Sequence, residues 1–270
     1  MVIRIGTAGF SYKDWEGKVY PSPKPKGFDP LAFLAAMFPT IEMNVTFYRV
    51  PTADNVAKWV ASAAANPDFK FTFKLYRGLT HDTEDETLPA FLDALAPCRD
   101  AGKLGAILIQ FPFYFRNTEQ TRARIAKLAQ GLEGWPCAIE LRDRSWLLPA
   151  ALQFLQERRL SLCDIDICQT KSSIPPGSWT TGPLGYVRFH GRNRDAWFDP
   201  KATVAQKYDY LYALEELRPW ADRVREIADA TEATYVIMNN HFAGKAVANA
   251  FHLLRLLDIR APQPPPNLVA

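Results

Sequence analysis

The sequence of 270 residues lacks the features of a membrane-spanning or secreted chain. Nowhere do about 18 apolar residues follow one another, which is the length that a membrane helix requires. The chain begins with the strand-like run Val2 to Ile5, without the basic segment and apolar core of a signal peptide. We therefore predict a cytoplasmic protein with no membrane partner.

Cysteine and strong net charge are also scarce. The cysteines fit no paired spacing such as CxxC and lie in or near apolar runs, which indicates structural, reduced thiols. They are Cys98, Cys137, Cys163 and Cys168. A net charge of +3 is far from the dense basic stripe of an obligate nucleic-acid binder. Hydrophobic residues make up 48% of the chain, which is enough for one continuous core.

What the chain does contain is an alternation of apolar strand-like runs with segments of helical periodicity. Eight runs are predicted as strands: Val2 to Ile5, Ile41 to Val45, Phe69 to Phe73, Ala106 to Phe111, Cys137 to Leu141, Leu160 to Ile165, Tyr186 to Phe189 and Tyr235 to Met238. Seven segments are predicted as helices: Pro30 to Met37, Asp54 to Ala65, Leu88 to Ala96, Glu119 to Leu132, Leu148 to Arg159, Tyr208 to Ala228 and Lys245 to Leu257.

This alternation is typical of parallel strands joined by helices. We predict an α/β fold, a single TIM-type (β/α)8 barrel that occupies residues 1–260 as one domain. An open doubly wound sheet is the alternative, but residues 6–9 form at most a fragment of its Gly-rich phosphate turn. Residues 174–178 contain Pro, Gly and Ser, so the crossover there is predicted to be a loop. The proline-rich residues 261–270 are predicted to form a flexible tail.

Each predicted strand ends in polar residues, and in a parallel barrel all eight carboxyl ends emerge on one face. Because alternate residues of a strand point to opposite faces, Glu140 and Arg142 should point into the barrel while Ile139 and Leu141 face the helices. The same reasoning turns three further pairs inward: Glu42 with Asn44, Thr72 with Lys74, and Arg188 with His190. The sequence thus predicts one polar site at the mouth of the barrel.

Carboxylates and imidazole suit acid or base catalysis, and imidazole is the side chain best matched to proton transfer near neutral pH. The catalytic candidates are Glu140, His190 and Asp164. Amides, cations and aromatic rings suit binding of a sugar or an anion. The substrate-binding candidates are Glu42, Asn44, Tyr48, Lys74, Gln110, Arg142, Arg188, Asn239, Asn240, Tyr12 and Trp15. The alternative interpretation is that these residues form structural ion pairs, satisfy loop backbones or anchor aromatic loops.

Four segments are distinctive: IGTAGFSYKDW at residues 5–15, IEMNVTFYRVP at 41–51, AIELR at 138–142 and YVRFHGR at 186–192. Together with residues 104–112, 145–146, 239–240 and 244–250 they resemble the YecE-like family, domain of unknown function 72. This resemblance spans nearly the whole chain and implies a TIM-type barrel. The family has been likened by fold to endonuclease IV and to sugar isomerases of the xylose-isomerase type, but the resemblance implies no established activity.

Two functions are therefore considered. The first is an enzyme acting on a phosphate- or sugar-containing anion, either a phosphodiester hydrolase or a sugar-phosphate isomerase or lyase. Glu140 or His190 would act as acid or base, while Arg142, Arg188 and Lys74 would hold the anion. The second is a non-catalytic binder of nucleic acid or of a nucleotide-like ligand, which would bind with a steep dependence on salt.

The sequence contains few residues that could bind a metal ion. With only four histidines, the chain offers too small a supply for a trinuclear centre like that of endonuclease IV. A single divalent ion held by Glu140, Asp164 and His190 is the remaining alternative, which the arginines on the same strands disfavour. No organic cofactor is expected.

Overall fold

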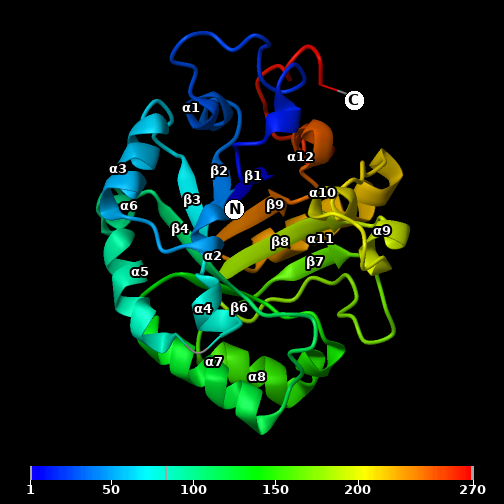
Figure 1. Ribbon diagram of the computed structural model, residues 1–270. Helices are drawn as coiled ribbons and strands as arrows, with labels where there is room; N and C mark the ends of the chain where they lie inside the picture. The colour runs from blue at the N-terminus through cyan, green and yellow to red at the C-terminus, as the bar shows by residue number, and fades with distance from the viewer. Residues whose placement is uncertain (1, 83, 269–270) are drawn as a thin grey trace.

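The computed structural model describes residues 2–82 and 84–268, in which parallel strands form a nearly closed barrel with helices around its outside (Figure 1). The strands are β1 (Ile3–Ala8), β2 (Thr40–Met43), β3 (Lys70–Lys74), β4 (Leu104–Gln110), β5 (Cys137–Glu140), β6 (Ser161–Leu162), β7 (Asp164–Ile167), β8 (Leu184–Gly191) and β9 (Ala233–Met238). All pairings between them are parallel. The predicted α/β fold with a TIM-type barrel is confirmed.

The helices of the described residues fall between these strands. They are α1 (Pro30–Ala35), α2 (Val45–Tyr48), α3 (Ala53–Ser62), α4 (Arg77–Thr80), α5 (Leu88–Ala94), α6 (Ala96–Asp100), α7 (Glu119–Gly131), α8 (Pro149–Glu157), α9 (Arg194–Phe198), α10 (Val204–Lys207), α11 (Leu214–Asp229) and α12 (Lys245–Leu256). Single turns of 3-10 helix lie at Lys13–Trp15, Asp85–Thr87, Arg144–Leu147 and Phe242–Gly244.

The sixth predicted strand is divided at Cys163 into β6 and β7. The first half pairs with β5 and the second half pairs with β8, so that one broken strand joins the two ends of the sheet. Counted as one, β6 and β7 bring the barrel to the eight strands that the sequence predicts. The crossover from β7 to β8 contains no helix in the described chain, as its composition indicates.

Local signals explain where several helices begin. Asp29 accepts hydrogen bonds from the backbone N–H groups of Leu31 and Ala32, at 2.8 and 3.2 Å, and so caps α1 directly before Pro30. One helix begins later than its pattern predicts. The predicted segment starts at residue 208, whereas α11 begins at residue 214, and the intervening residues form a loop at the mouth of the barrel.

Alternation of side chains along the strands divides the core into two parts. On β8, Val187 and Phe189 face outward into the large cluster that packs under the helices. Tyr186, from the same strand, points inward and joins a smaller apolar cluster inside the barrel, with Ala106, Leu108 and neighbouring residues. The barrel interior is therefore filled by side chains, as is usual for this fold, and its apolar layers lie beneath the polar carboxyl ends.

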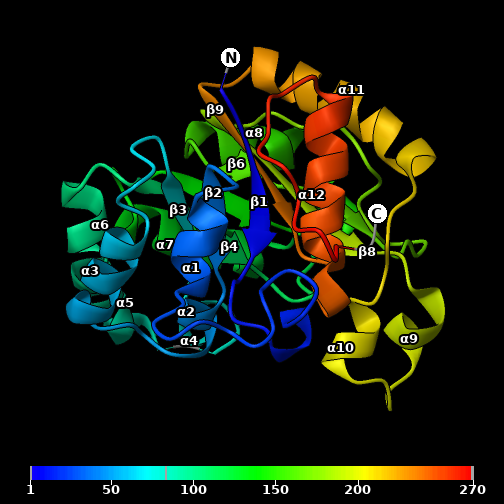
Figure 2. The ribbon, with the colours of Figure 1, turned by 90° about the horizontal axis from the view of Figure 1, so that it is seen from above.

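The carboxyl ends of the strands carry most of the irregular structure. In Figure 2 the short helices α2, α4, α9 and α10 lie at the end of the barrel toward which β1 points. The long helix α11 lies near the opposite end. Residues that follow different strands are thus brought to one face, where loops have room to build a site.

The C-terminal segment, which we predict to be a flexible tail, makes several contacts within its described part. Pro265 is buried, Leu268 packs against the main core, and Asn267 Nδ2 donates to the carbonyl oxygen of Gly17 at 3.1 Å. The last two residues of the predicted tail lie outside the described residues. Separately, none of the described helices has the length and apolar content that crossing a bilayer demands.

Close approach of β1 to β2 requires glycine at position 6. A Cβ atom at Gly6 would lie 1.9 Å from the carbonyl oxygen of Thr40, a backbone atom that cannot move without breaking the sheet. We expect Gly6→Ala to lower the free energy of unfolding by about 3 kcal/mol or more. Urea denaturation measures the change.

A matched control is Gly27→Ala, where nothing lies within 4 Å of the added methyl group but φ is +78°. That variant should lose only the 1 to 2 kcal/mol, roughly, that the left-handed backbone costs. Equal losses in the two variants would show that the contact with Thr40 is unimportant.

Candidate functional site

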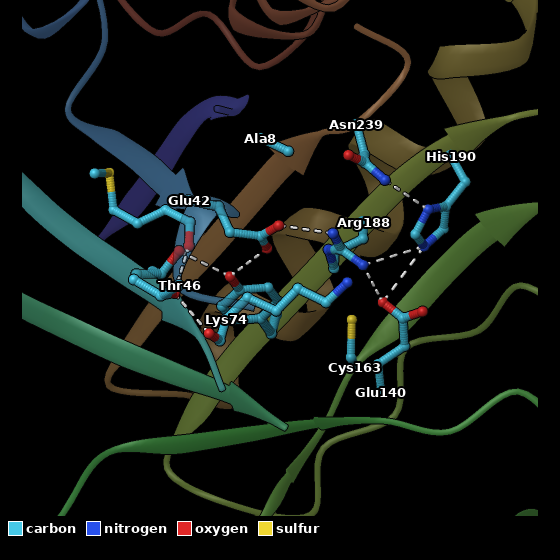
Figure 3. A network of polar contacts seen from close by, with 12 residues as sticks. Ala8, Glu42, Thr46, Lys74, Glu140, Cys163, Arg188, His190 and Asn239 are labelled. Atoms are coloured by element: carbon cyan, nitrogen blue, oxygen red, sulfur yellow. Dashed lines mark hydrogen bonds and ion pairs between the residues drawn. The ribbon is translucent and has the colours of Figure 1, made fainter. Parts of the chain in front are cut away.

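A buried arginine, Arg188 of β8, lies at the centre of the barrel mouth (Figure 3). Its Nη2 donates to Glu42 Oε1 at 2.6 Å, and its Nη1 forms an ion pair with Glu140 Oε2. The two glutamates come from β2 and β5, and none of the three side chains is more than 1% exposed. Burial lowers the pKa of Arg188, but the two carboxylates outweigh it and raise that pKa above its ordinary value. Arg188 therefore links three separate strands by charge.

On one side, Glu42 is held by a tyrosine. The hydroxyl group of Tyr186 lies 2.9 Å from Glu42 Oε2 and 2.9 Å from Thr72 Oγ1. It donates to the carboxylate, and its oxygen can accept a hydrogen bond from the threonine. Tyr186 lies two residues before Arg188 on β8, so both side chains point into the barrel. This arrangement orients Glu42 toward the guanidinium.

On the other side, Glu140 receives hydrogen bonds from two arginines. Arg142 contributes its Nε at 2.8 Å and its Nη2 at 2.6 Å to Glu140 Oε1, while Arg188 contacts Oε2. Burial raises the pKa of Glu140, but the charges of Arg188 and Arg142 outweigh it and hold that pKa well below its ordinary value. Glu140 is thus a carboxylate that is ion-paired with two guanidinium groups.

His190 is fully buried, and both of its ring nitrogens face polar neighbours. Nδ1 lies 3.0 Å from Asn239 Nδ2, and Nε2 lies 3.4 Å from Glu140 Oε2. Because the amide nitrogen of Asn239 can only donate, we assign the ring proton to Nε2, which faces the carboxylate. Burial lowers the pKa of His190 to about 4, although Glu140 acts in the opposite direction. The imidazole is therefore neutral at physiological pH.

Lys74 ends β3 and extends toward the same cluster in Figure 3. Its Nζ lies 3.8 Å from the centre of the Phe47 ring, and no acceptor for it lies within hydrogen-bonding distance among the described residues. Burial and the charge of Arg188 lower the pKa of Lys74 to about 7, against the opposing influence of Glu140 and Glu42. This amine consequently gains and loses its proton near neutral pH.

A cavity of about 260 Å³ opens above the cluster. Its lining comes from seven separate parts of the chain: Tyr12, Asn44, Tyr48, Lys74, Arg142, Arg188, Val204, Tyr208, Asn239 and His241. Three buried polar atoms of these residues have no partner within residues 2–82 and 84–268, namely Asn44 Oδ1, Arg188 Nε and His241 Nδ1. A cavity with unpaired donors and acceptors is suited to a polar ligand.

The charges around the cavity leave a positive surplus. The two carboxylates, Glu42 and Glu140, balance the two guanidinium groups of Arg142 and Arg188. Lys74 adds one further positive charge when it is protonated, and His190 adds none because it is neutral. The cavity is therefore electrostatically matched to an anion when Lys74 carries its proton.

Most of the predicted site residues are brought together by the fold. Seven of them line the cavity: Tyr12, Asn44, Tyr48, Lys74, Arg142, Arg188 and Asn239. Three more, Glu42, Glu140 and His190, are fully buried and contact that lining. Gln110 pairs in register with Glu140, and its side-chain amide donates to the Phe111 carbonyl at 2.5 Å.

Three predicted residues lie elsewhere. The Asp164 carboxylate accepts a hydrogen bond from the backbone N–H of Trp179 at 3.0 Å, away from the barrel interior, and burial raises its pKa well above the ordinary value. Trp15 is buried and donates from Nε1 to the carbonyl oxygen of His241 at 2.6 Å. Asn240 is buried too, and its amide binds the Tyr210 carbonyl at 2.8 Å. None of the three lines the cavity.

Sequence reasoning did not select several residues that the structure brings to the site. Tyr186 alternates with Arg188 and His190 along β8, so strand parity alone would have identified it as an inward residue. Tyr208 had no such signal, because it lies in a loop that was expected to be helical. His241 follows the predicted strand-end amides, and its ring stacks on Tyr12 with centroids 4.4 Å apart.

The described residues do not gather three or more His, Cys, Asp or Glu side chains in a way that could hold a metal ion. Glu140 and His190 are adjacent, but Asp164 points elsewhere. All four cysteines are buried and free, as expected.

A larger hollow of about 750 Å³ lies between α7, α8 and the start of β5. It is lined by the exposed residues Glu133, Glu157 and Arg159, among others. Buried, mutually paired ionisable groups are instead concentrated around the smaller cavity. We therefore take the smaller cavity, at the carboxyl ends of the strands, as the candidate site.

His190 should make the stability of the protein depend on acidic pH. A histidine in the unfolded chain titrates near pH 6.5, whereas burial lowers the folded pKa of His190 to about 4. Between these values the unfolded state binds more protons, so the free energy of unfolding falls as the pH decreases from 6.5 to 4. Moving from pH 7 to pH 5 should cost about 2 kcal/mol through this residue.

Urea denaturation of the wild type and of His190→Asn at both pH values measures this contribution. The variant should show a smaller decrease in stability between pH 7 and pH 5. An unchanged decrease would mean that His190 does not titrate differently in the folded and unfolded states.

Comparison with known proteins places the chain in a family. The family model described as "Protein of unknown function DUF72" matches residues 4–268. The chain is 31% identical to the UPF0759 protein YunF of Bacillus subtilis (strain 168) over 276 residues, covering 96% of this chain and 95% of that protein.

Two solved structures are similar to this chain in both sequence and fold. A DUF72 family protein from Enterococcus faecalis V583 has a TM-score of 0.84 and 30% identity, with complete coverage of both chains. One from Thermotoga maritima MSB8 has a TM-score of 0.82 and 28% identity, covering 96% of this chain and 100% of that one. The sequence likeness, the matching barrel and the nearly complete coverage lead to one conclusion: the chain belongs to the DUF72 family.

Proposed function

We propose that this protein is an enzyme that acts on a small anionic substrate containing a phosphate or a sugar, bound in the cavity at the barrel mouth. Hydrolysis of a phosphodiester and isomerisation or cleavage of a sugar phosphate are the reaction classes that suit such a ligand. The observation that carries the proposal is the cavity lined by Lys74, Arg142 and Arg188, in which buried polar atoms lack partners.

The cationic groups support recognition of an anion. Arg142 uses its Nε and Nη2 on Glu140 and presents the rest of its guanidinium to the cavity, since its side chain is 14% exposed. Arg188 has an unpaired Nε. A planar guanidinium can bind two oxygens of a phosphate or carboxylate at once, and hydrogen bonds to charged groups in a partly buried site are strong.

The size and the remaining lining support a small polar substrate. A cavity of about 260 Å³ is near the lower end of the range for small-molecule sites. Tyr12, Tyr48 and Tyr208 supply aromatic faces suited to a sugar ring, while Asn44 and Asn239 supply amide donors and acceptors. Tyr48 is 70% exposed and lies at the rim.

The geometry supports a positioning role for two of the predicted catalytic residues. Glu140 and His190 are fully buried beneath the arginines, and their polar atoms already have partners. We propose that they position Arg142 and Arg188. Lys74 and His241 line the cavity itself. Burial lowers the pKa of Lys74 to about 7, which suits this amine to proton exchange with a ligand near neutral pH.

Anion binding should weaken as the pH rises through about 7. Lys74 has its folded pKa at about 7, so the favourable positive surplus is present below this pH and lost above it. Sulfate is a suitable probe because its own charge stays constant in this range. Its dissociation constant, measured by isothermal titration calorimetry, should increase roughly tenfold between pH 6 and pH 8.

The matched variant for this measurement is Lys74→Met, which should bind sulfate weakly at both pH values. Sulfate binding by the wild type that is independent of pH would contradict the assignment of Lys74 as the titrating cation.

Arg142→Gln should reduce sulfate affinity at pH 6 by about tenfold or more, because a hydrogen-bonded charge in the cavity is lost. Arg144→Gln is the control, since Arg144 is exposed and does not line the cavity. Catalysis is tested by incubating the wild type and both variants with a panel of sugar phosphates and phosphodiesters and following the phosphorus spectrum by NMR.

Turnover by the wild type and by Arg144→Gln, with loss in Arg142→Gln, is the expected result. If no compound is converted while an oligonucleotide binds with steep salt dependence, the enzyme proposal is wrong and the protein is a nucleic-acid binder.

A further inference from the structure

The amine of Lys74 is placed unusually for a residue that only anchors an anion. It lies at the end of a barrel strand and lines the cavity. No carboxylate, carbonyl or hydroxyl oxygen of the described residues accepts a hydrogen bond from it. The side chain is only partly buried, and its amine reaches the cavity without a protein acceptor that would hold it in place. The amine of Lys74 is therefore placed to meet a bound ligand.

Some of the charges around Lys74 raise its pKa and others lower it. The ionisable side chains that face it come from several elements: Arg188 on β8, Arg142 after β5, Glu140 on β5, Glu42 on β2, and His81 after α4. Both carboxylates are occupied by guanidinium groups, which limits their effect on the amine. The Phe47 ring favours the ammonium form by a cation–π contact at 3.8 Å. The balance leaves Lys74 with a pKa of about 7, so half of the amine is neutral at that pH.

No other lining group offers the same chemistry. Guanidinium groups and the amides of Asn44 and Asn239 are poor nucleophiles, and burial raises the pKa of Tyr12 and Tyr208, which therefore keep their hydroxyl protons. His241 is a neutral base whose ring is stacked on Tyr12. A neutral lysine amine beside fixed positive charges is the arrangement in which lysine reacts with carbonyl carbon.

We infer that Lys74 is the nucleophile of the site and forms an imine with the aldehyde or ketone carbon of a small anionic substrate, whose charged group is held by Arg142 and Arg188. This inference rests on the proposed anion site and narrows its substrate to anions that carry a carbonyl group. It also favours the lyase and isomerase reaction classes over phosphodiester hydrolysis.

The step is balanced without an oxidant or reductant. The lone pair of Lys74 Nζ attacks the carbonyl carbon, the C=O π electrons move to oxygen, and a proton passes from nitrogen to that oxygen. The resulting carbinolamine takes up one proton from solvent, its C–O bond breaks, and water leaves. The product is a protonated imine, C=N⁺–H, formed from the neutral amine, the carbonyl compound and one proton. Its positive charge withdraws electrons from the neighbouring carbon, which is what bond cleavage or isomerisation there requires.

Glyoxylate is a suitable probe because it is a small aldehyde with a carboxylate. The full-length protein is incubated with glyoxylate and sodium cyanoborohydride at pH 7, and reduced adducts are mapped by peptide mass spectrometry. We expect a carboxymethyl group on Lys74, formed about tenfold or more faster than on exposed lysines. Sulfate should suppress this labelling by occupying the anion site, and neutral acetaldehyde should show less preference for Lys74.

Lys103 is an internal control. It is a buried lysine whose pKa is also lowered by burial, but its Nζ donates to the Asn66 carbonyl oxygen at 2.8 Å and lies outside the cavity. If a lowered pKa alone caused reactivity, Lys103 would be labelled as well. Because the adducts are mapped on the wild type, the result does not depend on whether a Lys74 variant folds.

The outcomes separate the two proposals. Labelling spread over surface lysines, with Lys74 unmodified in protein that binds sulfate, would overturn the imine inference and leave the anion site intact. Absence of sulfate binding would instead overturn the proposed function. Selective labelling of Lys74 that sulfate suppresses supports both.

Discussion

The pairing of Arg188 with Glu42 and Glu140 is the constraint on which the barrel mouth depends. Each of these charges costs several kcal/mol to remove from water, and the cost is offset only when the geometry is good and the remaining polar atoms are bonded. Tyr186 and Arg142 provide those further bonds. Strands β2, β5 and β8 are thereby held in one relative position, and the cavity above them takes its shape from this arrangement.

The same pairing explains why the cavity favours an anion. Both carboxylates are turned toward guanidinium groups, so neither neutralises Lys74 directly. His190 contributes no charge, because burial keeps it neutral and Asn239 and Glu140 face its two nitrogens. The apolar layer inside the barrel lies below and excludes water from the underside of the cluster. Apart from Lys74, the positive and negative charges of the site cancel. Its net charge therefore changes when this one amine gains or loses a proton.

Strand parity predicted much of this site from sequence, because alternation of side chains is a local property of extended backbone. Glu140 with Arg142, and Arg188 with His190, lie on the inner side as that reasoning requires. Asp164 did not join them, because Cys163 and Ile165 occupy the barrel interior and alternation turns the carboxylate between them outward. Loop residues follow no such alternation, so their side-chain contacts could not be predicted in this way. Trp15 was expected to meet a ligand, yet it is held in the core by a carbonyl oxygen 226 residues away.

The sequence by itself determined the parallel barrel, the order of its strands and the identity of most residues that point into its mouth, because hydrophobic periodicity is set within each segment. Only the tertiary structure decided which charges pair and which group is left over. Glu42 and Arg188 are separated by 146 residues, and their contact exists only once the barrel has closed. The lowered pKa of Lys74 likewise depends on burial and on charges from other strands, which no local pattern contains. The charge pairing and the lowered pKa at the barrel mouth therefore depend on closure of the barrel, whereas the sequence alone indicates which residues point into it.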